Sequence, residues 1–155
     1  MPVTINGSGT VSGISAGGLP DGTVDEITTY TPTWVGVTNT ANKAVWEWWR
    51  VGKLVTVAGV LKAASTTNNT TEVTFSLPVT PAAAPTNSSS IRGVGAAAKS
   101  NVDTIDYGSL HAVAYSGDSD GHIFAQSDNV AWVHLPSSRI AVNDEISIVL
   151  TYHGA

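Results

Sequence analysis

The stretch Ile146-Ser147-Ile148-Val149-Leu150-Thr151-Tyr152-His153 decides the fold class of this chain. Its large apolar residues recur at every second position, and Ser, Val, Thr and His occupy the positions between them. A period of two places the first set on one face of a β-strand and the second set on the other face. The residues Val142-Asn143-Asp144 before it are of the kind that form turns. The segment therefore predicts a strand with one buried face that begins after a turn.

Other segments along the chain have the same β character. Residues 53–62 are β-rich and apolar on both faces, which is typical of a central strand. Apolar runs bounded by turn residues predict further strands at 44–49, 72–77, 110–115, 122–126 and 130–135. Residues 93–99 contain three consecutive alanines, which are good helix formers, but the segment is too short to hold a helix without support. About seven or eight strands without strand–helix alternation predict an all-β fold, a jelly-roll-like two-layer β-sandwich.

The composition excludes several classes of function. The 155 residues include 7 basic and 12 acidic side chains, and Thr, Ser and Gly (19, 16 and 15 residues) make up roughly a third of the sequence. The absence of Cys excludes disulfides, zinc–thiolate sites and cysteine nucleophiles. A net charge of −5 with scattered cations argues against nucleic-acid binding. No apolar run reaches the ~18 residues of a membrane span, and the start does not resemble a signal peptide, so we expect cytosolic synthesis and no membrane insertion.

Residues 1–23 differ from the rest of the chain. They hold one charged residue, Asp21, and six of the fifteen glycines. Such a segment buries too little to fold alone, yet disordered tails are usually richer in charge. Spaced apolar residues suit an extended arm that lies on another surface. We therefore expect an arm at 1–23 and a β-domain at 24–155. The residues expected to anchor the arm are Val3, Ile5, Val11, Ile14 and Leu19.

No arrangement of residues predicts catalysis. Residues 13–17 fit the G-x-S-x-G string of serine hydrolases, but that chemistry needs a helix after the serine, and Gly18-Leu19-Pro20-Asp21-Gly22 cannot begin one. The carboxylate pairs Asp25/Glu26 and Asp144/Glu145 lie beside turns or at strand starts, where solvated charge is ordinary. We therefore expect a protein that is not an enzyme.

The candidate metal ligands are weak by spacing. Asp118-Ser119-Asp120-Gly121 begins like a calcium loop, but His122 and Asn129 stand where that loop needs an oxygen ligand and a Glu, so we expect a hairpin tip solvated by two carboxylates. None of the four histidines lies at H-x-H spacing, and each is expected to be solvated or hydrogen-bonded. A histidine stacked on a three-fold axis stays open. We predict no metal and no cofactor. The four histidines are His111, His122, His134 and His153.

A cluster of tryptophans is the unusual local feature. Trp46 and Trp48 share one face of a predicted strand, whereas Trp49 shares the other face with Glu47. Indoles bury ~150–250 Å² each, so they belong in a core or an interface, or stack on sugars or bases. Core packing, a subunit interface and a ligand platform all stay open for these three residues.

Three groups of residues together resemble a known family. Residues 3–22 (VTINGSGTVSGISAGGLPDG) resemble an arm of tail fibres and related virion proteins of tailed bacteriophages. Tyr30-Thr31-Pro32-Thr33-Trp34, Arg50-Val51-Gly52-Lys53-Leu54-Val55 and Phe75-Ser76-Leu77-Pro78-Val79 are similar to the small β-domain that ends many of those fibres. The resemblance implies a homotrimer on the virion surface with a jelly-roll-like head, and it brings no active site.

Two functional hypotheses follow from the resemblance. The first is a virion structural protein of the tail-fibre or receptor-binding type, anchored by its arm and binding a host-surface glycan or protein through loops. The alternative is a capsid decoration (cement) protein that clamps neighbouring capsomers. In both, the expected partners are copies of itself and neighbouring virion proteins of the tail, baseplate or capsid. We expect the protein in the virion, after assembly in the host cytoplasm.

Overall fold

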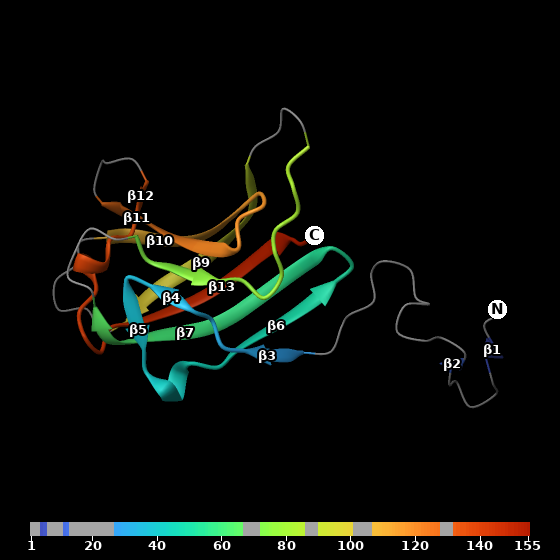
Figure 1. Cartoon of the computed structure of the whole chain (residues 1–155), viewed down its shortest axis with the longest axis horizontal. Coiled ribbons are helices and arrows are strands. Elements are labelled where there is room, and N and C mark those ends of the chain that lie inside the picture. The colour runs from blue at the N-terminus through green and yellow to red at the C-terminus, as the bar shows by residue number, and fades with distance from the viewer. Residues whose placement is uncertain are drawn as a thin grey trace.

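The computed structural model describes residues 4–5, 11–12, 27–66, 72–85, 90–100, 107–127 and 132–155, and these residues are all-β (Figure 1). The strands are β1 (Thr4–Ile5), β2 (Val11–Ser12), β3 (Thr28–Tyr30), β4 (Trp34–Val35), β5 (Val37–Asn39), β6 (Trp46–Val51), β7 (Leu54–Thr66), β8 (Thr74–Ser76), β9 (Ile91–Ser100), β10 (Tyr107–Tyr115), β11 (Asp120–Ser127), β12 (Val133–His134) and β13 (Glu145–His153). Two short 3₁₀ helices, η1 (Ala41–Lys43) and η2 (Ser137–Arg139), lie between strands. Within the described ranges, no helix is long and apolar enough to cross a membrane. The all-β expectation is confirmed.

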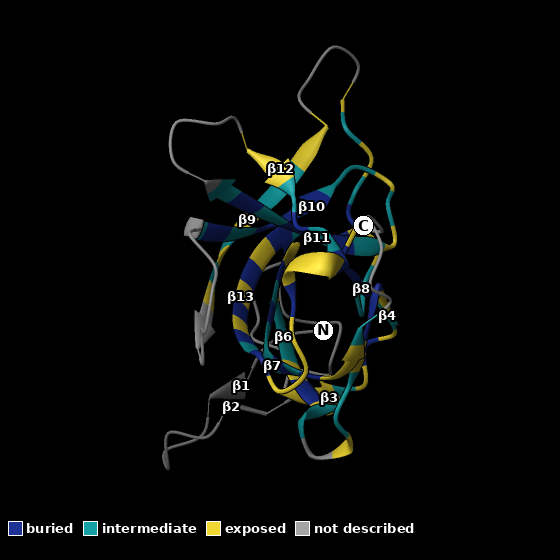
Figure 2. Cartoon of the chain, turned by 90° about the vertical axis from the view of Figure 1, so that its left-hand side faces the viewer, coloured by how far each residue is buried: buried dark blue, intermediate teal, exposed yellow. Residues whose placement is uncertain are grey.

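Eleven of the described strands form one antiparallel sheet. Its order is β3-β6-β7-β13-β9-β10-β11-β8-β4, with β5 added beside β7 and β12 beside β11. The two ends of this order, β3 and β4, are separated in the chain by only residues 31–33. Because so few residues span at most ~15 Å, the sheet must curl until its ends approach each other. Figure 2 shows this curl end-on. β1 and β2 form a separate two-stranded pair.

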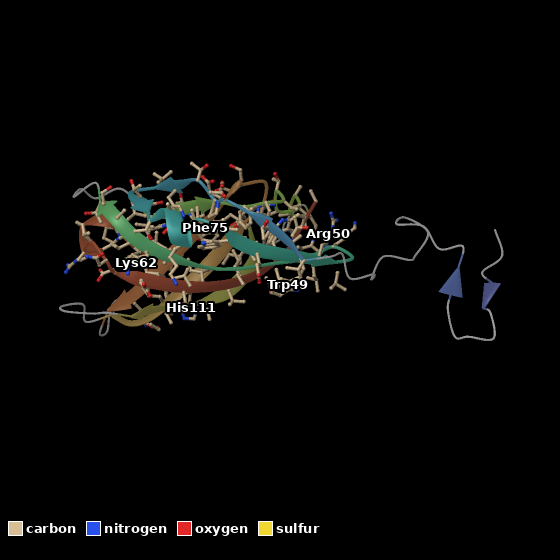
Figure 3. The ribbon with its side chains drawn as sticks, turned by 90° about the horizontal axis from the view of Figure 1, so that it is seen from below. Trp49, Arg50, Lys62, Phe75 and His111 are labelled. Atoms are coloured by element: carbon tan, nitrogen blue, oxygen red, sulfur yellow. The ribbon has the colours of Figure 1, made fainter. Side chains whose placement is uncertain are left out.

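The core fills the inside of the curl. Along β13 the side chains of Ile146, Ile148, Leu150 and Tyr152 are buried, and the residues between them face outward, as the period of two predicts. The neighbouring β7 lies between β13 on one side and β6 and β5 on the other, so the segment predicted at 53–62 is a central strand. Figure 3 shows Phe75 among the strands of the curled sheet, whereas Trp49 and His111 lie toward its margin.

An aromatic group occupies the centre of the core. Trp46 is 1% exposed, and its ring lies 5.4 Å from that of Trp34 and 5.1 Å from that of Phe75, measured between centroids. Its indole N–H donates to the carbonyl oxygen of Val60 at 3.2 Å, so burial leaves no polar atom of the ring unpaired. A Cβ on Gly59 would lie 2.1 Å from the Trp46 ring, and this explains why a glycine faces the indole.

The alanine-rich segment at 93–99 lies in a strand. Its residues form most of β9, which is hydrogen-bonded to β13 on one edge and to β10 on the other. The good helix-forming propensity of alanine is outweighed because both strand edges are paired, an effect that local propensity does not register. Gly93 and Gly95 lie opposite Tyr152 and Leu150 of β13, so the smallest residues of β9 face large inward side chains.

The turns follow the sequence in two places. Asn143 adopts a φ of 75° in the turn before β13, and the backbone N–H of Ala141 donates to the buried carboxylate of Asp144 at 2.7 Å. Residues 116–119 connect β10 to β11, with Gly117 at a φ of 70°. The hairpin expected at this tip is present. Asp118, however, accepts hydrogen bonds from the protein and is not simply solvated, as described below.

Candidate functional site

The outward face of the central strands is a first candidate for function. Cross-strand register aligns Ala58 of β7, Val149 of β13 and Ala96 of β9 in one row across the sheet. Val149 is 51% exposed and Val94, in the adjacent row, is 56% exposed. We call this surface the outer face. It comprises Glu47, Trp49, Thr56, Ala58, Val60, Ser147, Val149, Thr151, Val94, Ala96 and Ala98.

The outer face is low in charge and shallow in relief. Small and β-branched side chains predominate, and the hydroxyls of Thr56 and Thr151 are hydrogen-bonded to each other at 2.9 Å. An ion pair between Lys62 and Glu145, with Nζ and Oε1 3.2 Å apart, lies at one end of the face. An open hollow of about 360 Å³ crosses β6, β7 and β13 beside Val149. A surface of this kind suits contact with another protein better than binding of a small molecule.

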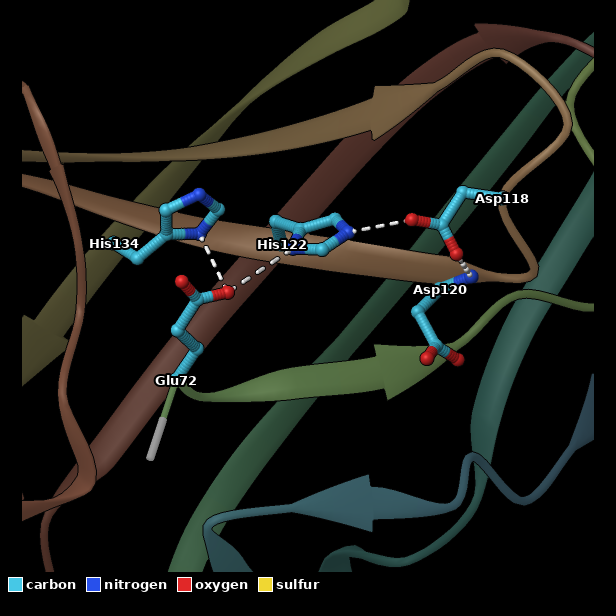
Figure 4. A network of polar contacts seen from close by, with 5 residues as sticks. All are labelled: Glu72, Asp118, Asp120, His122 and His134. Carbon is cyan, nitrogen blue, oxygen red and sulfur yellow. Dashed lines mark hydrogen bonds and ion pairs between the residues drawn. The ribbon is translucent and has the colours of Figure 1, made fainter. Parts of the chain in front are cut away.

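A second candidate is a cluster of two histidines and a glutamate at the edge formed by β8, β11 and β12. His122 lies on β11, His134 on β12, and Glu72 in an isolated bridge with Pro136, two residues before β8. The Nδ1 atoms of His134 and His122 lie 3.2 Å and 4.0 Å from the same oxygen, Oε2 of Glu72 (Figure 4). Single ligand atoms from the three side chains all lie within 4.8 Å of one another.

The fold brings these three side chains together through strand register. Phe124 of β11 pairs with His134 of β12, and His122 lies two residues before Phe124 on the same face. The backbone N–H of Val73 donates to the carbonyl oxygen of Leu135, which holds the Glu72 segment beside β12. Ring contacts support the imidazoles, since the Phe124 and His134 centroids are 4.1 Å apart. The cluster is therefore built on paired strands.

Asp118 orients His122 from the opposite side. Oδ2 of Asp118 lies 2.9 Å from Nε2 of His122, and Oδ1 accepts from the backbone N–H of Asp120 at 3.1 Å (Figure 4). Burial acts to raise the pKa of Asp118, but the hydrogen bonds from His122 and from backbone N–H groups outweigh it and lower the pKa overall. The carboxylate is therefore ionised at neutral pH, and the imidazole Nε2 is the donor in this contact.

Two imidazole nitrogens of the cluster have no hydrogen-bond partner among the described residues. They are Nδ1 of His122 and Nδ1 of His134, and both atoms are buried. Burial lowers the pKa of the His134 imidazole, Glu72 opposes that shift, and His122 reinforces it. His134 is therefore neutral at pH 7. Neutral imidazoles and a carboxylate are ligands that first-row transition metals accept in proteins.

The residues expected to anchor the arm fall mostly outside the described part of the chain. Ile5 lies in β1 and Val11 in β2, where the two residues are register partners. Val3, Ile14 and Leu19 lie outside the described residues. The anchoring role of all five stays a prediction.

The three tryptophans lie on two faces of β6. Trp46 is in the centre of the core, and Trp48 packs against that core while half-buried. Trp49 points the other way, belongs to the outer face, and pairs in register with Thr56. A role of Trp49 in a subunit interface stays a prediction.

Sequence reasoning missed the histidine–glutamate cluster. His122 and His134 are 12 residues apart and Glu72 is 50 residues before His122, so no spacing rule connects them. One signal was present, because treating the predicted strands 122–126 and 130–135 as a hairpin places His134 beside the His122 face of the first strand. The other two histidines are elsewhere, since His111 packs its ring 4.2 Å from that of Trp132 and His153 ends β13.

Comparison of the chain with protein-family models, with curated proteins and with solved structures finds no match. The fold described above therefore rests on the strands and their register. Any function has to be argued from the outer face, from the histidine–glutamate cluster and from the sequence motifs.

Proposed function

We propose that this chain is a structural protein of a tailed-bacteriophage virion, of the tail-fibre or receptor-binding type, that assembles as a homotrimer and is not an enzyme. In this proposal residues 24–155 form a jelly-roll-like head and residues 1–23 form the arm that anchors it. The observation that carries the proposal is the outer face, a broad and nearly uncharged sheet surface on a chain whose motifs resemble virion proteins.

The outer face has the properties that self-association requires. Valine, alanine and threonine side chains lie flat on paired strands, so ordering them on contact costs little side-chain entropy. Burial of apolar surface contributes about 25 cal/mol per Å², and a standard interface buries about 800 Å² on each partner. Charge lies mainly at the rim, with Lys62 and Glu145, so two identical faces meet without burying like charges. Copies of the same chain are therefore the partner that the face fits.

The proposed mechanism is binding. The arm docks on a neighbouring virion protein of the tail or baseplate, and the trimer presents three sets of polar loops to a host-surface glycan or protein. Three linked sites make weak single-site binding sufficient. The loops expected to carry these contacts are 66–71, 81–90 and 116–121, of which 67–71 and 86–89 lie outside the described residues.

The copy number of the chain per virion tests this proposal against the capsid decoration alternative. Quantitative mass spectrometry of purified particles, scaled to the major capsid protein, measures it directly. A few to tens of copies, found with tail fractions after the particles are disrupted, is the expected result. Hundreds of copies in the head fraction contradict the tail-fibre type and support decoration, and absence from the particle contradicts both.

Binding of the purified chain to host cells is the second test. We expect saturable binding that competes with infection. A decoration protein does not bind host cells, so folded, trimeric protein that shows no binding contradicts the receptor-binding role.

A further inference from the structure

We propose that Glu72, His122 and His134 form a binding site for one divalent transition-metal ion of the Zn²⁺ type. The site lies within a single chain, at the junction of β11, β12 and the residues before β8. It does not depend on the proposed virion function, because it is argued only from the side chains that meet there.

Hydrogen bonding leaves the cluster with three acceptors that face one another. Nε2 of His122 donates to the Asp118 carboxylate at 2.9 Å, so in the neutral imidazole Nδ1 carries a lone pair. That lone pair points toward Oε2 of Glu72, which can only accept when it is ionised. Nδ1 of His134 is buried, 3.2 Å from the same oxygen, and makes no hydrogen bond within the described residues. A cation between the three atoms satisfies all of them.

The distances fit a small movement into a coordination sphere. Ligands about 2.0–2.1 Å from a tetrahedral ion lie ~3.3 Å apart. The His134–Glu72 separation of 3.2 Å already meets this value, and the His122–Glu72 separation of 4.0 Å must shorten by less than an ångström. The Glu72 side chain is 52% exposed, so its flexible carboxylate can make that adjustment, and its solvent side leaves room for a water ligand.

The ligand chemistry selects the class of metal. Two imidazole nitrogens disfavour Ca²⁺ and Mg²⁺, which take oxygen ligands, and favour Zn²⁺ and its first-row neighbours. Asp118 supplies the outer contact that metal-ligating histidines usually make, a carboxylate on the second ring nitrogen. Such an ion links three segments that are far apart in the sequence, so its role is to fasten the short strand β12 and the Glu72 segment onto β11.

A Zn²⁺ titration of the metal-free full chain, without an oligohistidine tag, tests the proposal. Competition with a chromophoric chelator measures affinity and stoichiometry. We expect one Zn²⁺ per chain with a Kd of about 10 μM or tighter. Glu72→Gln and His134→Gln should each weaken binding by more than about 100-fold, and Asp118→Asn by about 10–100-fold.

Matched variants separate this site from non-specific binding. His111→Gln and Glu47→Gln change the same residue types outside the cluster and should bind Zn²⁺ as the wild type does. Absence of binding by the folded wild type at 10 μM Zn²⁺ contradicts the proposal and leaves Glu72 as an ion-pair partner of the histidines. Binding that survives both cluster variants contradicts it as well.

A measurement on the unaltered protein covers the case in which a cluster variant does not fold. Co²⁺ added to the wild type should give visible ligand-field bands of a four- or five-coordinate site with nitrogen ligands, and Zn²⁺ should abolish them at one equivalent. Absence of these bands, or bands that Zn²⁺ does not displace, overturns the proposal.

Discussion

The inner and outer faces of β6, β7, β13 and β9 belong to the same strands and differ in almost every other respect. The inner face carries the largest residues, among them Trp46, Leu150 and Tyr152, and these are almost completely buried. The outer face carries Ala, Thr and Val, and its central residue Val149 is half-exposed. Since neither face is rich in charge, polarity alone does not distinguish them. The inner face is complete within one chain, whereas the outer face is apolar without a cover in one chain.

The comparison predicts that substitutions on the inner face act on folding and substitutions on the outer face act on association. Each experiment below either breaks that division or sharpens it. The effects are ordered from the largest change in unfolding free energy to the smallest.

Removing the central indole should have the largest effect. Trp46→Ala deletes a fully buried ring that contacts Trp34 and Phe75, and it should lower the free energy of unfolding by about 3–5 kcal/mol. Urea unfolding followed by circular dichroism measures the change. Val94→Ala on the exposed side is the control, and it should change the unfolding free energy by less than about 0.5 kcal/mol. Equal effects of the two variants contradict the division between faces.

Alkaline pH should weaken the inner face next. Burial raises the pKa of Tyr152 to about 12, with its hydrogen bond to Val79 and the charge of Arg50 acting in the opposite direction, and burial also raises the pKa of Tyr30. Above pH 10 the unfolded chain releases these phenolic protons while the folded chain retains them, so stability is full below pH 10 and falls as the pH rises toward 12. At ~1.4 kcal/mol per pH unit for one tyrosine, we expect a loss of about 2–3 kcal/mol from Tyr152.

Denaturant unfolding at pH 9, 10 and 11 checks this dependence. Tyr152→Phe keeps the ring and removes the titrating group, so its stability should fall less between pH 10 and 11 than that of the wild type. An identical pH dependence for the two proteins contradicts the assignment to Tyr152.

Adding one methyl group beside the indole should have a smaller effect. A Cβ at Gly59 meets the Trp46 ring at 2.1 Å, so Gly59→Ala should destabilise the fold by about 1–3 kcal/mol. Because the clash is with the indole, the same substitution should cost much less in a Trp46→Ala background. Urea unfolding of the two single variants and the double variant gives the coupling. Additive effects show that the clash is not with Trp46.

Changing the hydroxyl pair on the outer face should have the smallest effect on folding. Thr56→Val removes one partner of the exposed Thr56–Thr151 hydrogen bond and keeps the β-branched shape. We expect a change below about 0.5 kcal/mol in thermal or urea unfolding. A loss above about 2 kcal/mol shows that the outer face contributes to the fold of the single chain and breaks the comparison.

Local patterns predicted the central strands and missed what strand pairing creates. The period of two in 146–152 and the apolar run at 53–62 are properties of neighbouring residues, so the sequence alone located β13 and β7. The helix-forming alanines of β9 gave no strand signal, because that strand is held by hydrogen bonds to β13 and β10. β3, β4 and β5 were not predicted, since strands of two or three residues carry too little periodicity to detect.

The candidate sites show the same limit. The outward residues of β13 could be identified from alternation, but the breadth of the outer face depends on which strands lie beside it. The histidine–glutamate cluster depends on long-range register, since Glu72 joins His122 and His134 only after β12 and the residues before β8 pair at the sheet edge. The hydrogen bond between Asp118 and His122 was also unpredicted, although both residues lie in one hairpin.

The mass of the full chain in solution tests the central claim, that the outer face is the contact between copies, most directly. Sedimentation equilibrium should give three times the 16.0 kDa chain mass for the wild type. Val149→Glu should reduce it to a single chain while the circular dichroism spectrum is unchanged. Val35→Glu, an equally charged change at an exposed valine of β4, should leave the trimer intact. A monomeric wild type, or a trimer that survives Val149→Glu, would contradict the account.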